Sequence, residues 1–583
     1  MIRDHLSFPD KMQKILAVAR QDRPADLLLK NCRLIDVLNS EIIETNLAIQ
    51  DSMIAAAGSE YVSARKVIDL EGRYAAPGLI DAHLHIESTL LFPPELARVL
   101  VVHGTTCVIN DPHEIANVLG IEGVKLMLDA APGLPCDFYS TAPSCVPATD
   151  LETSGGEVTA DQVDELLNHA RVVGLGEMMN YPGIINGEQE VLAKVAAAHQ
   201  KGKVVDGHAP GLTGTDLQAY LSAGISTDHE CITAAEAEEK IRSGMKVIIR
   251  HGSASSSLAE LLPLVNSQTV DAFMFGSDDR EAGELLNRGH LNELLKTAVS
   301  LGADPLQLLK IATINAAKHY RLFDRGLLAP GFLADLVVFE DLKNFKAELV
   351  IKNGQVVAES GKLTVDVPAA TLPEKALGTV SLGRNLKSDD FKLSAGKDKL
   401  PVIGVVPGQL VTEKLMVQVT ADENDQLKAD PDQDIIKIAV IERHKASGRM
   451  AVALVKGMGL KEGALASSVA HDSHNILVAG VEEQAMAAAV NELARADGGF
   501  TVVNGRGQVQ ATLPLPVAGL MSDQPAAVVA AEMDRILFAA KELGTRLDQP
   551  FLTLAFLALP VIPSLKITDR GLFDVDNFQF IEL

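Results

Sequence analysis

The chain has 583 residues, of which 47% are hydrophobic and 22% are charged, and its formal net charge is −25. This ordinary globular balance excludes a largely disordered chain, and the length predicts about three or four domains rather than one core. The negative charge would repel a nucleic-acid backbone, so we expect no nucleic-acid partner.

Cysteine usage and hydropathy indicate the compartment. The five cysteines are scattered without a Cys-x-x-Cys pair, which argues against a disulfide framework and a thiolate zinc site. The first residues lack the apolar core of a signal peptide. The most apolar late stretch, 551–563, is broken by Pro560 and Pro563 and is shorter than the ~20 residues of a membrane span. We expect a cytoplasmic protein with no membrane segment.

Patterns of apolar residues divide the chain into five segments. Residues 1–24 have helical spacing, and residues 25–75 switch to short β-like runs separated by turn residues. The same β-like pattern returns over 325–374, so we predict a small β-sandwich built from both flanks of a central domain, 76–324. Residues 375–583 mix strand-like and helical runs and are predicted to form an additional C-terminal α/β domain.

The central segment repeats a strand and helix rhythm. Eight strand-like runs end in polar residues and alternate with helical segments over about 250 residues, as a closed (β/α)₈ barrel requires. The predicted strands are the stretch that begins at 77, then 105–110, 137–141, 172–177, 203–206, 224–228, 246–250 and 271–275. We therefore predict an α/β fold with a TIM-like barrel, whose chemistry lies at the carboxyl ends of its strands.

The first of these strands ends in two histidines. It reads Pro-Gly-Leu-Ile-Asp-Ala-His-Leu-His over 77–85, and because side chains alternate along a strand, His83 and His85 point to the same side. Such a pair can begin a metal site, although two histidines on one strand face also occur simply facing solvent. Further candidate ligands at later strand ends favour the metal site.

The set of candidate ligands suits divalent metal ions. Four imidazoles and two carboxylates fit a pair of Mn²⁺, Fe²⁺ or Zn²⁺ ions. The candidates are His83, His85, Glu177, His208, His229 and Asp278. Glu177 could bridge two ions, and a metal pair ~3.5–4 Å apart can hold a hydroxide because it lowers the pKa of bound water toward ~7. Asp278 would accept the hydroxide proton and pass it to the leaving group as a general acid and base.

These residues resemble the amidohydrolase superfamily and, within it, the bacterial adenine deaminase family. The narrower resemblance covers nearly the whole chain, in motifs at 83–88, 110–115, 176–180, 207–211, 226–230, 277–280, 469–475 and 557–563. It implies that His83, His85, Glu177 and Asp278 hold one metal and that Glu177 bridges to a second metal on His208 and His229. The implied reaction is hydrolytic deamination of adenine to hypoxanthine and ammonia, by a metal-bridging hydroxide, in purine salvage.

Two departures from sister families sharpen the resemblance. Members that cleave cyclic amides often bridge their metals with a carbamylated lysine, but 172–180 contains no lysine and Glu177 takes that place. Adenosine-type deaminases resemble one another in a His-Ala-Gly-Glu stretch, whereas this chain has His-Ala-Pro-Gly over 208–211. The general-acid glutamate of that family is therefore missing.

Other polar residues have weaker functional claims. Asp111, His113 and Glu114 could bind the purine edge or carry a proton, or could only form a turn around Pro112. Arg250 could contact substrate or support the site from outside.

The C-terminal domain has a cluster of its own, over 471–474. His471, Asp472 and His474 could reach over the barrel mouth and close the site or bind a metal; the alternative is a polar turn needed for folding. We favour a functional role, because such groups are expensive to bury without partners.

Two other functions stay open at this point. One is a hydrolase of a cyclic amide or another aminated heterocycle, because the metal ligands do not fix the substrate pocket. The other is a catalytically dead assembly scaffold. We expect adenine and water as small-molecule partners and a homodimer or higher homo-oligomer.

Overall fold

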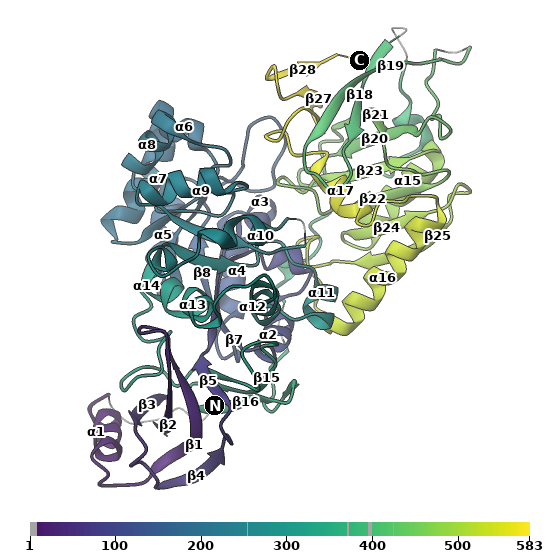
Figure 1. Cartoon of the computed structure of the whole chain (residues 1–583). Helices are drawn as coiled ribbons and strands as arrows, with labels where there is room; N and C mark the ends of the chain where they lie inside the picture. Colours follow the sequence, from purple (N-terminus) through teal and green to yellow (C-terminus); the bar gives the residue numbers. More distant parts are fainter. Residues whose placement is uncertain (1–7, 254, 370–371, 395–398, 424, 583) are drawn as a thin grey trace.

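The structure is a computed structural model that describes residues 8–253, 255–369, 372–394, 399–423 and 425–582. Figure 1 shows a mixed sheet near the N-terminus, a central region of strands and helices, and a C-terminal region with its own large sheet. Helix α1 (Phe8–Ala19) lies within the predicted helical segment 1–24. Residues 1–7 of that segment lie outside the described residues.

The first sheet joins strands from both flanks of the central region. Its order is β17-β16-β15-β14-β5-β1-β2-β3, with β4 beside β1, and β5 pairs antiparallel with β14. Side chains alternate along β1, so Leu27 and Leu29 enter one hydrophobic cluster while Leu28 packs with α1. The strands are β1 (Ala25–Asp36), β2 (Glu41–Gln50), β3 (Met53–Ala57), β4 (Ala64–Asp69), β5 (Tyr74–Pro77), β14 (Leu336–Phe339), β15 (Ala347–Lys352), β16 (Gln355–Glu359) and β17 (Lys362–Leu363).

The central region contains two parallel sheets, in the orders β10-β9-β8-β7-β6 and β11-β12-β13. Hydrogen bonds connect the edges of the two sheets. Asp278 N donates to His83 O at 3.0 Å, and Ser226 N donates to Val205 O at 2.9 Å. The strands are β6 (Leu79–Leu84), β7 (Thr105–Asn110), β8 (Asp137–Ala142), β9 (Val172–Met178), β10 (Val204–Gly207), β11 (Thr227–Asp228), β12 (Lys246–Arg250) and β13 (Phe273–Gly276).

Helices connect these strands. Polar residues mark their starts: Thr159 and Gln162 form a capping box at α5, and Thr233 caps α9 by accepting a hydrogen bond from Glu236 N. The helices are α2 (Pro93–Val101), α3 (His113–Leu119), α4 (Ile121–Ala130), α5 (Ala160–Leu166), α6 (Tyr181–Asn186), α7 (Gln189–Gln200), α8 (Gly214–Ser222), α9 (Ala234–Arg242), α10 (Leu258–Leu261), α11 (Ala282–Asn287), α12 (Leu291–Ser300), α13 (Pro305–Lys310) and α14 (Ala316–His319).

Two predicted strands are shorter in the structure. The run 224–228 is a strand only at Thr227–Asp228, because Gly224 has a φ of +92° and closes the turn after α8. The run 271–275 begins with a 3₁₀ turn, Val270–Ala272, before β13. Apolar character alone therefore overestimated the length of both strands.

The C-terminal region has an eight-stranded sheet in the order β19-β18-β21-β20-β23-β22-β24-β25 and a three-stranded sheet of β26 to β28. Its elements are β18 (Lys399–Val405), β19 (Thr412–Gln418), β20 (Ile435–Ile441), β21 (Met450–Lys456), β22 (Ala464–Ser467), β23 (Ile476–Gly480), α15 (Glu483–Arg495), β24 (Gly499–Val503), β25 (Val509–Pro514), α16 (Ala526–Glu542), α17 (Pro550–Phe556), β26 (Leu565–Thr568), β27 (Gly571–Asp574) and β28 (Gln579–Ile581). No helix in the described part of the chain has the length and hydropathy to cross a bilayer.

One hydrophobic core is shared by the central and C-terminal regions. Leu84 and Ile86, at the end of β6, belong to the same buried cluster as Ile438 on β20 and Phe500 on β24. Burial of such side chains contributes roughly 1.5–3 kcal/mol each. The C-terminal region is thereby fixed against the strand end that carries His83 and His85.

We predict that Ile438→Ala destabilises the C-terminal region by about 2–5 kcal/mol, because Ile438 is fully buried and its truncation leaves a cavity. Urea unfolding followed by circular dichroism measures the change. Met416→Ala, at a side chain that is 59% exposed, is the control and should change stability by less than about 0.5 kcal/mol. Equal effects of the two substitutions would contradict the assignment of the core.

Candidate metal centre

The predicted ligands converge at the ends of the parallel strands. His83 lies on β6 and His85 directly follows it, while Glu177 lies near the end of β9. His208, His229 and Asp278 follow β10, β11 and β13. All six side chains are buried except that of His208, which is 28% exposed. Carboxyl ends of neighbouring parallel strands share one edge, which is why residues far apart in sequence meet here.

Glu177 lies between two groups of histidines. Its Oε1 is 3.4 Å from His85 Nε2, and its Oε2 is 2.7 Å from His208 Nδ1 and 3.1 Å from His229 Nε2. The two oxygens therefore face different imidazoles. This is the arrangement that a carboxylate bridging two metal ions requires.

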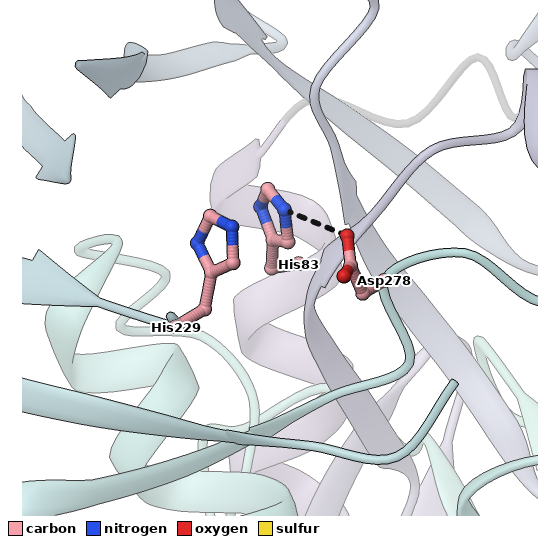
Figure 2. A group of neighbouring side chains, drawn as sticks. All are labelled: His83, His229 and Asp278. Atoms are coloured by element: carbon pink, nitrogen blue, oxygen red, sulfur yellow. Dashed lines mark ion pairs between the residues drawn. The ribbon is translucent and has the colours of Figure 1, made fainter. Parts of the chain in front are cut away.

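Asp278 completes the group on the other side. Its Oδ1 is 3.5 Å from His83 Nε2 and 3.3 Å from His85 Nε2. Figure 2 shows His83 between Asp278 and His229, whose ring stacks on that of His83 at a centroid distance of 4.0 Å. His83 Nε2 is buried and makes no hydrogen bond to any described residue. A buried nitrogen that has a carboxylate nearby but no hydrogen bond is a position where a bound cation would supply the missing interaction.

The carboxylates and imidazoles influence each other's ionisation. Burial raises the pKa of Glu177, but His208 and His229 outweigh it and hold the pKa well below its usual range. Burial likewise opposes the charge of Asp278, and Arg250 with the histidines lowers its pKa. Burial lowers the pKa of His85, yet Asp278 and Glu177 raise it well above 6.5. The pocket therefore favours positive charge next to its two carboxylates.

The donor set fits divalent metal ions. Ligand atoms lie within 4.8 Å of one another in the groups His83, His229 and Asp278, then His83, His85 and Glu177, and then Glu177, His208 and His229. Imidazole and carboxylate donors suit Mn²⁺, Fe²⁺ and Zn²⁺. A divalent ion would replace the protons that the carboxylates otherwise draw to the histidines.

Asp111, His113 and Arg250 lie directly around this group. Asp111 Oδ2 accepts a hydrogen bond from Glu177 N at 2.8 Å, and His113 Nδ1 is 3.2 Å from Glu177 Oε1. Arg250 Nη1 donates to Asp278 Oδ2 at 2.7 Å. These residues hold Glu177 and Asp278 from outside the candidate ligands.

Glu230 was not among the predicted site residues. It pairs with Arg250, and its Oε1 is 3.6 Å from His229 Nε2. The signal for it was its place directly after His229, in a motif already used for the neighbouring residue.

Glu114 links the centre to the C-terminal region. Its Oε1 is 2.6 Å from His471 Nδ1, its Oε2 pairs with His474 Nε2, and Oε1 is 3.5 Å from His113 Nε2. His474 Nδ1 accepts a hydrogen bond from Ala470 N, so Nε2 carries the proton that is donated to Glu114. Asp472 is also buried, and its Oδ2 has no partner among the described residues.

A pocket opens between the central and C-terminal regions, beside Asp279. Ser88 Oγ donates to Asp279 Oδ1 at 2.5 Å, and a ligand oxygen of Asp279 lies close to those of Asp278 and to His85. The pocket is lined by Ser88, Leu90, Asp279, His471, Phe551 and Leu552, among others. It offers apolar walls with a carboxyl group at the end nearest the candidate ligands.

Both the central and the C-terminal part of the chain match known protein families. Residues 74–357 match the model of the amidohydrolase family, and residues 409–579 match that of the adenine deaminase C-terminal domain. The chain is 46% identical over 570 residues to an adenine deaminase of Desulfatibacillum aliphaticivorans, covering 98% of this chain and 99% of the other. It is 45% identical over 572 residues to adenine deaminase 2 of Carboxydothermus hydrogenoformans, with the same coverage. Among solved structures, atrazine chlorohydrolase TrzN from Arthrobacter aurescens TC1 is 16% identical, with 58% of this chain and 97% of that chain covered and a TM-score of 0.45.

We predict that the contact between His471 and Glu114 stabilises the protein in a pH-dependent way. Burial lowers the pKa of His471, but Glu114 outweighs it and raises the pKa to about 9. An unfolded histidine titrates near 6.5, so the contribution is complete below pH 6.5 and disappears as the pH rises through 9. Loss of the charged pair in His471→Gln should cost about 3 kcal/mol at pH 6 and much less at pH 9.5.

Urea unfolding of His471→Gln and of the parent protein across this pH range measures the difference. His169→Gln, at an exposed histidine on the central region, serves as the control and should leave stability within about 0.5 kcal/mol. A destabilisation by His471→Gln that does not change with pH would contradict the charged pair.

Proposed function

The chain belongs to the adenine deaminase family of the amidohydrolases, and we propose that it hydrolyses adenine to hypoxanthine and ammonia at a pair of divalent metal ions. The main support is the position of Glu177, whose two carboxylate oxygens face separate sets of histidines. Similarity to adenine deaminases along the full chain supports the substrate.

The strands around the site support a closed (β/α)₈ barrel. We infer that β6 to β13 form one barrel, because hydrogen bonds join the edges of the two parallel sheets at His83 with Asp278 and at Val205 with Ser226. A parallel bridge between Leu84 and Asp278 lies at the first of these seams. Closure would place all the candidate ligands around one mouth.

The metal assignment follows the two sides of Glu177. One ion would be held by His83, His85, Asp278 and Glu177, and the other by Glu177, His208 and His229. When bound, such ions lower the pKa of a water toward neutrality and so supply a nucleophile at pH 7. The ligand set is compatible with Mn²⁺ or Fe²⁺, our first expectation, and with Zn²⁺.

Asp278 is positioned for proton transfer. Its Oδ2 is held by Arg250, while Oδ1 faces the candidate ligands. In the proposed reaction, the oxygen of water forms a bond to C6 of adenine, while Asp278 takes a proton from that water and delivers it to the exocyclic nitrogen. The bond from C6 to nitrogen then breaks and ammonia leaves.

The purine ring would lie in the pocket beside Asp279. Leu90 and Phe551 offer apolar surface for a flat aromatic ring, and Ser88 and Asp279 offer hydrogen-bonding groups at its edge. Asp111 and His113 contact Glu177, and Glu114 contacts His113. We assign them to the orientation of Glu177 rather than to the purine.

The C-terminal region contributes through Glu114. His471 and His474 fix both oxygens of this carboxylate, and Glu114 in turn lies next to His113. His471 also lines the pocket and stacks on Phe556 with ring centroids 4.7 Å apart. We propose that this contact closes the site on adenine and excludes water. The place in purine salvage, the cytoplasmic location and the homo-oligomeric state remain predictions of the sequence.

We predict that the protein, stripped of metal with a chelator and reloaded with Mn²⁺ or Fe²⁺, releases ammonia from adenine but not from adenosine or cytosine. The stripped protein should be inactive, because its residues alone do not generate the nucleophile. An enzyme-coupled ammonia assay and a ring-opening assay with dihydrouracil measure the activities. If adenine releases no ammonia although two metal ions are bound, the proposed function is wrong; ring opening would then favour the cyclic-amide alternative, and no activity would favour a scaffold.

We also predict that Glu177→Gln lowers kcat/KM for adenine at least about 100-fold, because substitutions outside the metal ligands already cost 10–100-fold in comparable sites. The amide keeps the shape of the side chain but removes its charge. Metal analysis should show fewer than two ions per chain. Glu165→Gln, at an exposed carboxylate on α5, should change neither value; normal metal content and activity in Glu177→Gln would exclude a bridging role.

A further inference from the structure

A buried ion cluster lies behind His208 and His229. Lys240, on α9, is completely buried. Its Nζ donates to Asp228 Oδ2, to Glu236 Oε1 at 2.6 Å and to Ala209 O at 2.7 Å. An ammonium group has three N–H donors, so each one has an acceptor here. The position of Nζ is therefore fixed from three directions.

The acceptors of Lys240 adjoin the two histidines. Ala209 directly follows His208, and Asp228 directly precedes His229. Asp228 Oδ1 also accepts hydrogen bonds from Ala209 N at 3.2 Å and from Glu230 N at 3.0 Å. The cluster thus holds the backbone after His208 and on both sides of His229.

Glu236 extends this hold to the loops that follow. Its Oε1 accepts a hydrogen bond from Gly211 N at 2.8 Å, and its Oε2 accepts one from Ile232 N at 3.3 Å. The loops after β10 and β11 are therefore both tied to α9.

The sheet itself does little to hold these two strand ends together. Strand β11 has only two residues, and in the described chain no ladder pairing joins β10 with β11. The seam has a backbone hydrogen bond from Ser226 N to Val205 O, and side-chain hydrogen bonds from Ser226 Oγ to Val205 O, from Gly207 N to Thr227 Oγ1 and from Thr227 Oγ1 to Asp206 Oδ1. All of them precede the histidines in sequence, so contacts beyond the strand ends also bear on the distance between His208 and His229.

That distance is short. His208 Nδ1 and His229 Nε2 are 3.2 Å apart, and both face Glu177 Oε2. Two imidazoles turned toward one carboxylate oxygen are placed as two ligands of one ion would be. The backbone that carries each ring sets this spacing.

We propose that Lys240 is a positioning residue for the divalent ion that His208 and His229 would hold. This inference rests on the proposed two-metal function. Lys240 would not touch the ion; it would act through Ala209 and Asp228, which adjoin the two histidines. Loss of an outer interaction of this kind typically weakens metal binding 10–100-fold.

The test is a Mn²⁺ titration of the metal-free full-length protein, with free Mn²⁺ counted by its electron paramagnetic resonance signal. The parent should bind two ions per chain. Lys240→Met should bind one ion with unchanged affinity and the other at least tenfold more weakly. The control is Lys352→Met. It removes another buried lysine, which pairs with Asp335 and Asp137 and contacts none of the candidate ligands. It should bind two ions like the parent.

A milder variant covers failure of Lys240→Met to fold. Glu236→Gln removes one acceptor charge and keeps the pair of Lys240 with Asp228. It should weaken the binding of the ion at His208 and His229 at least about threefold. Unchanged binding of both ions in the folded variant, or equal weakening of both ions, would overturn the inference. If the parent itself binds fewer than two ions, the proposed function fails, and the role of Lys240 with it.

Discussion

The central constraint on this molecule is the packing of four imidazoles and two carboxylates into one buried site. A buried charge without a partner costs several kcal/mol, so each carboxylate needs cationic or donating neighbours. Glu177 has His208 and His229, and Asp278 has Arg250. These groups attract and repel one another at close range. They keep their spacing because interactions outside the site hold the strand ends.

Those outer interactions fall at the two seams between the parallel sheets. At one seam, Asp81 Oδ1 accepts hydrogen bonds from His83 N at 3.1 Å and from Ser277 N at 3.2 Å, while its Oδ2 is 2.9 Å from His290 Nε2. At the other seam, Asp228 Oδ1 accepts a hydrogen bond from Ala209 N, and Lys240 Nζ donates one to Ala209 O. These contacts lie next to His208 and His229. Each seam thus has a buried carboxylate with a nitrogen partner. The edges that are poorest in ladder hydrogen bonds are the ones that carry most of the candidate ligands.

The sequence pointed to the candidate ligands more clearly than to the residues that hold them in place. The candidates stood out because polar residues at the ends of apolar runs are unusual, and the family resemblance divided them between two metal ions. Lys240 lies in a helical segment, where a charged residue is ordinarily solvated, and His290 lies just before one, so nothing marked either of them as buried. That both flanks build one β-domain was predicted from their shared pattern, but local periodicity does not encode which strands meet there, β5 with β14. Strand lengths failed at Gly224, where backbone conformation outweighed apolar character.

The hydrophobic core shared by Leu84, Ile438 and Phe500 has a consequence in time. A ribosome releases the central region before the C-terminal strands exist, so Leu84 and Ile86 are exposed to water while the strands that cover them are still being made. The apolar side chains at the end of β6 are covered only after the last third of the chain has docked. A chain interrupted in its final third would therefore expose this apolar surface to aggregation.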